Sequence, residues 1–383
     1  MPILRKSPSR RRSPIGDFLA VLLLTVMIGA VIWFWWHQKH PKKQAKPSPA
    51  IAVPATIPAA KPIPVVVTPP IPPVEPVTPI EKPKPKPGEI APPSTADFPR
   101  PMRDVLEAQI ALARRVVSPG SIDSAIGSQT RAAIAAFQRS EKLPATGTLD
   151  TNTRALLMLD APPLTTYTVT SNDLARLQPL GKTWLAKSEQ TALDYETILK
   201  LVAEKAHSHP LLIQKLNLAV NWTNVPAGTI LKIPDASYPE LDGKAAFVVI
   251  HLSEKYLEAF DAETNLMAHF PCSIAAKVEK RPVGELHVIV IAPNPNYTVN
   301  PELFPESAEL QALGHKLILP PGPNNPVGVA WIGLDRPGYG MHGTPVPEQV
   351  GRTESHGCFR LANWDAEYLL KLSWIGMPVN VVP

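Results

Sequence analysis

The sequence predicts a multidomain α+β protein: a transmembrane helix and a proline-rich linker, then a small helical bundle, a small α+β module and a β-rich domain. Three observations support this. An uncharged apolar run lies near the N-terminus, proline is concentrated before residue 102, and apolar spacing changes from helical to strand-like along the chain. The 383 residues suffice for two or three folded domains.

Residues 1–40 are predicted to form a cytoplasmic tail and a membrane anchor. Several arginines precede the uncharged run from Phe18 to Trp36, which has the length that a bilayer requires. Tryptophans at its end are typical of the membrane interface, and their bulk favours an anchor over a cleaved signal peptide. The basic N-terminus predicts a single-pass membrane protein whose N-terminus lies in the cytoplasm and whose folded domains lie on the other side of the membrane.

Residues 41–100 are predicted to be a disordered linker. Proline alternates there with alanine, valine, isoleucine and lysine, as in Lys82–Pro87, and proline lacks the N–H that helices and sheets need. Extended polyproline II segments would span up to roughly 190 Å, at about 3.1 Å per residue. The net charge of +5 comes from basic residues at the N-terminus and in this linker. That placement indicates a membrane or wall polymer as the partner and no nucleic acid.

Residues 101–160 have helical apolar spacing in three pieces. Pro119-Gly120 and Pro144–Gly147 separate the pieces, and Asp150 precedes the third as a helix N-cap would. The segment resembles the peptidoglycan-binding three-helix module. That resemblance rests on Ile122-Asp123, Gly127, Thr130-Arg131, Phe137-Gln138, Leu143-Pro144, Gly147 and Asp150. It implies wall binding, and a helical spacer without a ligand is the alternative.

Residues 165–234 are predicted to form a second module, with a strand at Tyr167–Val169, helical segments, and a closing turn and strand. The closing segment Val225–Pro234, VPAGTILKIP, resembles the end of a LysM carbohydrate-binding module. An insertion from about Leu174 to Leu199 departs from that family. A glycan site and a purely structural unit therefore both stay open.

Residues 240–383 are predicted to be a β-rich sandwich or barrel. Residues 246–252 and Leu257–Phe260 suggest a hairpin. Further strands are expected at Glu285–Ile291, Val329–Leu334 and Val379–Val382. One helix is expected from Trp364 to Leu372, with Asn363 as its N-cap.

Cys358, one of two cysteines in the chain, is the candidate nucleophile. A thiol needs a base, because the thiolate is the reactive form, and His342 is a plausible one. Gly357 allows a tight turn in which main-chain N–H groups can face an oxyanion. Three alternatives remain: a small buried side chain, a zinc site with His342 and His356, which lacks a second cysteine nearby, and a disulfide with Cys272.

The stretch Met341–Leu361 resembles the signature of the L,D-transpeptidase catalytic domain, also called the YkuD domain. The matching pieces are His342-Gly343-Thr344 and Ser355-His356-Gly357-Cys358-Phe359-Arg360-Leu361, where Phe359 replaces the usual aliphatic residue. Other matches are Pro293-Asn294-Pro295, Pro321–Pro326, Trp331-Ile332-Gly333-Leu334 and Gly338-Tyr339-Gly340. The chain departs from the family at Ser273-Ile274-Ala275 and Arg281–Gly284.

This resemblance implies peptidoglycan L,D-transpeptidation without a metal or cofactor. Cys358 would form a thioester with a tetrapeptide stem, and an amine acceptor would release it. His342 would be the base, held in its useful tautomer by the carbonyl of Gly343. The oxyanion hole is assigned to the N–H groups of His356, Gly357 and Cys358, and substrate contacts are assigned to Arg360, Ser355, Tyr339 and Trp331.

The partners implied by the resemblance are stem peptides and glycan strands, with the membrane reached through the N-terminal helix. Two rival functions remain. One is an L,D-carboxypeptidase or cross-link hydrolase, in which water replaces the acceptor amine. The other is a wall-binding anchor without activity, which the candidate nucleophile and base disfavour. If the two modules served only to bind the wall, deleting residues 101–234 would leave turnover of a small soluble muropeptide almost unchanged.

Overall fold

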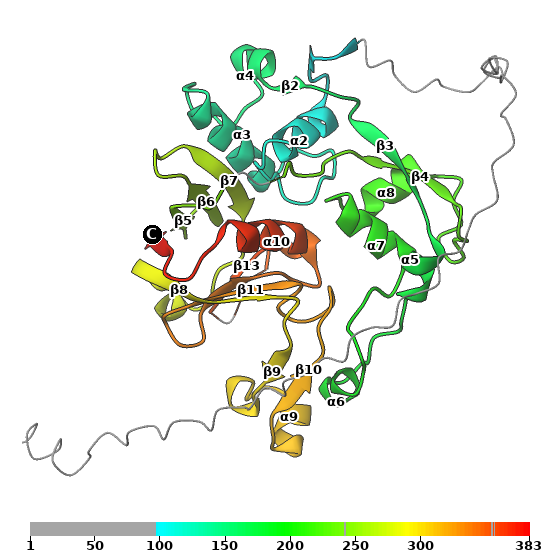
Figure 1. The fold of residues 1–383 in the computed structure, drawn as a ribbon, viewed down its shortest axis with the longest axis vertical. Helices are drawn as coiled ribbons and strands as arrows, with labels where there is room; N and C mark the ends of the chain where they lie inside the picture. Colours follow the sequence, from blue (N-terminus) through cyan, green and yellow to red (C-terminus); the bar gives the residue numbers. More distant parts are fainter. Residues whose placement is uncertain (1–96, 241–242, 354, 356) are drawn as a thin grey trace, which may run out of the picture. The chain divides into compact units, whose positions relative to one another are not determined.

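The computed structural model describes residues 97–240, 243–353, 355 and 357–383 (Figure 1). The predicted anchor, the predicted linker up to residue 96, and His356 lie outside these described residues. Among the helices within the described ranges, none is long and apolar enough to cross a membrane. The described residues all belong to one compact unit, Lys84–Pro383.

The first module is the predicted helical bundle. Its elements are β1 (Arg100–Pro101), α2 (Val105–Ala113), α3 (Ser128–Ser140), α4 (Thr151–Leu156) and β2 (Met158–Leu159). The Asp150 carboxylate accepts a hydrogen bond from the Thr153 N–H at 2.8 Å, which confirms the predicted cap. Ile134 and Phe137 face the core as the spacing predicts, and both are fully buried.

The second module pairs an opening and a closing strand around helices. Its elements are β3 (Leu164–Thr168), α5 (Ser171–Ala175), α6 (Trp184–Ser188), α7 (Ile198–Lys205), α8 (Pro210–Leu216) and β4 (Ile230–Pro234). Strands β3 and β4 are antiparallel, as expected of an opening and a closing strand. The insertion contains α6 and packs against the third domain. Leu193 from this insertion shares a small core with Val299 and Leu310.

The third domain is built on one eight-stranded mixed sheet with the order β13-β12-β11-β8-β14-β5-β6-β7. Its strands are β5 (Phe247–His251), β6 (Tyr256–Phe260), β7 (Leu266–Pro271), β8 (Gly284–Pro293), β11 (Ala330–Leu334), β12 (Gly340–His342), β13 (Phe359–Arg360) and β14 (Pro378–Val382). The pairs β12/β13 and β14/β5 are parallel, and the other neighbours are antiparallel. The predicted β5–β6 hairpin is confirmed.

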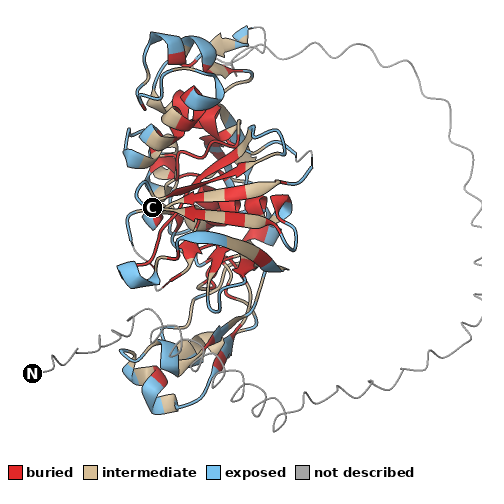
Figure 2. Ribbon diagram, turned by 90° about the vertical axis from the view of Figure 1, so that its left-hand side faces the viewer, coloured by how far each residue is buried: buried red, intermediate tan, exposed pale blue. Residues whose placement is uncertain are grey.

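The two outer strands of this sheet are joined by a bridge. Ser273, two residues after β7, exchanges two hydrogen bonds with Arg360 of β13, at N···O distances of 2.8 and 3.0 Å. The sheet therefore curls so that its first and last strands meet, as in a barrel. Figure 2 shows buried residues along the strands of this sheet. Helix α10 (Asn363–Leu372) packs against them and contributes Leu369 and Leu372 to the same core.

A small subdomain interrupts the third domain between β8 and β11. It consists of β9 (Tyr297–Val299), α9 (Ala308–Leu313) and β10 (Leu317–Leu319), with β9 and β10 paired antiparallel. Short 3-10 turns lie at Val278–Lys280, Pro301–Leu303 and Pro347–Gln349. The sequence analysis did not predict this subdomain, because its strands are too short for a clear alternation of apolar residues.

The predicted N-cap of α10 is wrong. The capping residue is Ala362, and Asn363 is already the first residue of the helix. The Asn363 side-chain carbonyl accepts a hydrogen bond from the Thr344 N–H at 3.0 Å. Because that carbonyl serves a different loop, it does not cap its own helix.

The helical module covers the edge of the sheet at β7. Val117 forms a parallel bridge with His269, and the Ser118 N–H donates to the His269 carbonyl at 2.8 Å. The Arg139 guanidinium also pairs with the buried Glu258 carboxylate at 2.5 Å. An exposed sheet edge invites aberrant pairing. Deleting residues 101–234 would uncover this edge. We therefore expect the deletion to destabilise the third domain itself.

Candidate active site

Cys358 lies where two short strands run side by side. Strand β13 begins directly after it and pairs in parallel with β12, so that Phe359 lies opposite Met341 and Arg360 lies opposite His342. The Leu361 N–H donates to the His342 carbonyl at 2.8 Å. This register brings the two motifs of the sequence together, with His342 at the end of β12 and Cys358 directly before the adjacent strand β13.

The loop before Cys358 is folded by Ser355. The Ser355 hydroxyl donates to the Cys358 carbonyl at 2.5 Å and accepts from the Gly357 N–H at 3.3 Å. Ser355 is buried, so its hydroxyl shapes the turn that carries the thiol. A direct contact of Ser355 with substrate stays a prediction, and His356 lies outside the described residues.

The surroundings of Cys358 favour the protonated form of its thiol. Burial raises the pKa of Cys358 to about 11, although a hydrogen bond from the Gly340 backbone and the charge of Arg360 act in the opposite direction. The thiol donates to the Gly338 carbonyl at 3.3 Å. Activation therefore requires a base that takes the proton as the sulfur attacks.

His342 is arranged as that base. Its Nδ1 lies 2.6 Å from the carbonyl oxygen of Gly343, which can only accept a hydrogen bond. Nδ1 therefore carries the proton and Nε2 keeps a free lone pair, as the resemblance implied. Burial lowers the pKa of His342 to about 4, so the ring is neutral and able to accept a proton.

Trp331 and Arg360 flank this ring. Trp331 lies opposite His342 across β11 and β12, and the two rings stack with centroids 5.7 Å apart. Burial lowers the pKa of the Arg360 guanidinium, and the thiolate form of Cys358 opposes that shift. Both residues therefore adjoin the reactive pair, and their predicted substrate contacts stay predictions.

Two tyrosines also border the site. Tyr339 was predicted, and its hydroxyl donates to the Lys280 carbonyl at 3.0 Å. Tyr297 in β9 was missed by the sequence analysis. Burial raises the pKa of Tyr297, and the charge of the Cys358 thiolate adds to the rise. The only sequence signal was its position just after the Pro293-Asn294-Pro295 match.

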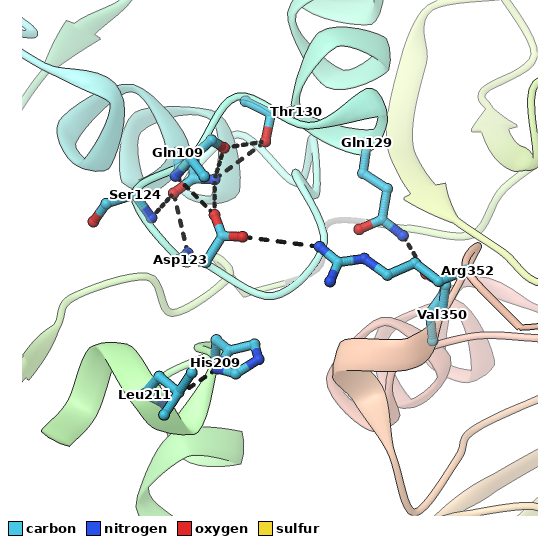
Figure 3. A network of polar contacts seen from close by, with 10 residues as sticks. Gln109, Asp123, Ser124, Gln129, Thr130, His209, Leu211, Val350 and Arg352 are labelled. Carbon is cyan, nitrogen blue, oxygen red and sulfur yellow. Dashed lines mark hydrogen bonds and ion pairs between the residues drawn. The ribbon is translucent and has the colours of Figure 1, made fainter.

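The helical module contacts the loop that leads to Cys358 (Figure 3). The Gln129 side-chain amide donates to the Val350 carbonyl at 2.5 Å, and Arg352 pairs with the Asp123 carboxylate at 3.9 Å. Gln109 in turn holds Asp123 by a hydrogen bond of 3.0 Å between the side chains. The module thus supports the nucleophile loop from outside the catalytic sheet.

The alternatives to a nucleophilic cysteine can now be compared with the structure. Both cysteines are free, and burial raises the pKa of Cys272 to about 12, as expected of an inert core thiol. Within the described residues, no group of three histidine, cysteine, aspartate or glutamate side chains could hold a metal ion. His356, which the zinc alternative requires, is not among those residues.

The neutral thiol and neutral imidazole predict a steep pH dependence of alkylation. With a pKa of about 11, about one Cys358 in ten thousand is a thiolate at pH 7. In the Cys272→Ser variant, the rate of alkylation by iodoacetamide should rise about tenfold per pH unit between pH 7 and 10. A rate that is already at its plateau at pH 7 would show a thiolate–imidazolium pair instead.

Comparisons with known proteins agree with this geometry. Residues 245–381 match the family model of the L,D-transpeptidase catalytic domain. Residues 102–157 match a model described as "Putative peptidoglycan binding domain". Neither of these two matched models covers the second module, residues 165–234. The LysM-like character of that module stays a prediction.

Individual relatives are distant. The chain is 24% identical over 188 residues to "Putative L,D-transpeptidase YkuD" of Bacillus licheniformis, which covers 49% of this chain and 94% of that protein. It is 35% identical over 105 residues to "Putative L,D-transpeptidase YqjB" of Bacillus subtilis, covering 26% of this chain and 51% of that protein. A crystal structure of L,D-transpeptidase 3 from Mycobacterium tuberculosis aligns with 16% identity and a TM-score of 0.28, over 42% of this chain and 77% of that chain.

The matched catalytic model spans the whole sheet and both motifs, and the second model spans the helical bundle. By these matches, residues 245–381 are similar to the L,D-transpeptidase catalytic domain, also called YkuD, and residues 102–157 are similar to a putative peptidoglycan binding domain.

Proposed function

We propose that this protein is a peptidoglycan L,D-transpeptidase whose nucleophile is Cys358 and whose general base is His342. One observation carries the residue assignment: the Gly343 carbonyl fixes the proton on Nδ1 of His342 and leaves Nε2 free, on the strand beside the thiol. The match of residues 245–381 to the catalytic domain model supports the reaction class.

The first half of the reaction acylates the enzyme. Nε2 of His342 takes the thiol proton as the Cys358 sulfur bonds to the carbonyl carbon of the third residue of a tetrapeptide stem. Backbone N–H groups of the Gly357–Cys358 turn stabilise the oxyanion, a contribution commonly worth about 10²–10³ in rate per donor. The imidazolium then protonates the terminal D-Ala amine as its C–N bond breaks, and a thioester remains.

The second half transfers the acyl group. An acceptor amine attacks the thioester carbonyl, Nε2 of His342 takes the amine proton, and the C–S bond breaks to regenerate the thiol. The product is a new amide, either a 3→3 cross-link between stems or a bond to a protein. The thiol, the imidazole and the amine supply the electron pairs that these bond-forming and proton-transfer steps need, so the proposed reaction uses no cofactor.

We also propose that both accessory modules bind wall glycan. The helical module matches a peptidoglycan-binding model. The second module has the antiparallel strand pair and the intervening helices that its LysM-like ending predicts. Two such modules beside one catalytic site would raise the local concentration of stems, up to the millimolar range for linked sites.

Replacing the nucleophile tests the reaction. Cys358→Ala should abolish both the acyl-enzyme and the products formed from a disaccharide tetrapeptide, as read by mass spectrometry. Cys272→Ser is the matched control and should keep nearly full activity, because that thiol is buried and inert. Turnover by Cys358→Ala would disprove the mechanism. Tripeptide products without cross-links would identify a carboxypeptidase instead.

Wall binding is tested by sedimentation with purified sacculi. The inactive Cys358→Ala protein should sediment with sacculi at physiological salt and should remain bound when ionic strength is raised, because sugar recognition does not depend on net charge. The chain carries a formal charge of +5. Release by salt alone would therefore indicate nonspecific attraction, and protein that stays in the supernatant would leave the modules as structural units.

We propose, finally, that the uncharged run from Phe18 to Trp36 anchors the protein in the cytoplasmic membrane. The full-length protein should then be recovered from the membrane fraction with its original N-terminus, and N-terminal sequencing measures this directly. A mature protein that begins after residue 36 would show a cleaved signal peptide.

A further inference from the structure

The side-chain amide of Asn363 uses its whole hydrogen-bonding capacity. Its oxygen accepts from the N–H groups of Thr344, at 3.0 Å, and Val329, at 3.4 Å. Its nitrogen donates to the Glu204 carboxylate at 2.9 Å and to the Pro323 carbonyl at 3.2 Å. An amide has two donors and two acceptor sites. With all four engaged, Asn363 is fixed in orientation and holds the chain directly after Gly343.

The absence of a side chain at two glycines provides the space that this amide occupies. A Cβ on Gly343 would lie 2.2 Å from the Asn363 oxygen, and a Cβ on Gly328 would lie 2.0 Å from the same atom. Neither separation is possible between real atoms. The glycine after the catalytic histidine is therefore required here by the approach of Asn363, which ties that amide to the loop of the base.

One of the residues that orient the Asn363 amide belongs to another domain. Glu204 lies on α7 of the second module, and its Oε1 accepts from both Asn363 Nδ2 and the Tyr195 hydroxyl, the latter at 3.0 Å. Glu204 is 9% exposed. Burial raises the pKa of Glu204 to about 7, with Lys200 and Glu348 as the nearby charges.

The second oxygen of Glu204 has a different setting. Among the described residues, Oε2 has no hydrogen-bond partner. Glu204 also lines a cavity of about 220 Å³, together with Lys200, Val346 and Trp364. Both side-chain hydrogen bonds of Glu204, to Asn363 and Tyr195, use Oε1. A glutamine at this position can therefore keep both bonds through its side-chain oxygen.

We propose that Glu204 is a positioning residue for the catalytic base. Through Asn363 it fixes the main chain at Gly343 and Thr344, and the Gly343 carbonyl in turn holds Nδ1 of His342. This inference rests on the proposed function only in taking His342 as the base. It assigns the second module a part in the active site, whether or not that module also binds glycan.

The test compares a non-polar replacement with a conservative one. Glu204→Leu removes the acceptor and should lower kcat on a small soluble muropeptide by about ten- to a hundredfold, the effect expected of a displaced catalytic group, with KM little changed. Glu204→Gln keeps the Oε1 acceptor and should restore kcat to within about twofold of wild type. A small muropeptide is the right substrate, because wall binding cannot influence its turnover.

Asp365 provides the matched control. It lies two residues after Asn363 on the same helix, is buried, and accepts hydrogen bonds from Tyr238, at 2.5 Å, and Ser118, at 3.1 Å. Asp365→Leu should therefore lower the melting temperature about as much as Glu204→Leu without a comparable loss of kcat. Equal loss of kcat in both leucine variants, or unchanged kcat in a folded Glu204→Leu variant, would overturn the proposal.

A second readout does not need turnover. In nitrogen-15 spectra of the histidine rings, the Nδ1–H signal of His342 should be single in the wild type and in Glu204→Gln, and weakened or split in Glu204→Leu. If the wild type shows this signal but does not turn over stems, the proposed function fails. The comparison of the signal in Glu204→Leu and in the wild type still tests the positioning role. If Glu204→Leu does not fold, Glu204→Asp replaces it, because the shorter chain withdraws the acceptor and keeps the charge.

Discussion

The parallel pairing of β12 with β13 is the contact on which the rest of the site depends. These strands are three and two residues long, too short to hold a register alone, and a shift of one residue would reverse every side chain. Ser273 on the other side of β13 and the covering helix α10 secure the pair. The barrel closure thus holds the strand of the imidazole, β12, beside the strand that directly follows the thiol, β13.

Burial sets the chemistry of this pair. The same desolvation that raises the thiol pKa lowers the imidazole pKa, because each group loses the hydration of its charged form. In the resting site these shifts favour a neutral thiol and a neutral imidazole over an ion pair between the two. In the proposed reaction, charge develops only as the substrate carbonyl is attacked, and the backbone N–H groups of the turn at Gly357 and Cys358 would then act on it at low local dielectric.

Local patterns were enough to predict many of the helices and strands and to select the candidate residues of the site. Cys358, His342 and the Gly343 carbonyl are close in sequence to the motifs that identify them, and the hairpin β5–β6 follows from alternation. The supports of the site were not predictable in this way. Glu204 and Asn363 are separated by 159 positions, and nothing in either segment indicates the other. Asn363 was misassigned because an asparagine before an apolar helix also fits a capping role.

This long separation has a consequence for folding. Contacts between distant segments form late, since the loop between them must close first. Glu204 joins Asn363 over 159 positions and Ser118 joins Asp365 over 247, and both contacts end on helix α10. By the proposed role of Glu204, the chain gains its organised base only after the second module has docked on the third domain. A partly folded chain can already expose a cysteine, but it does not yet present that cysteine to an aligned imidazole.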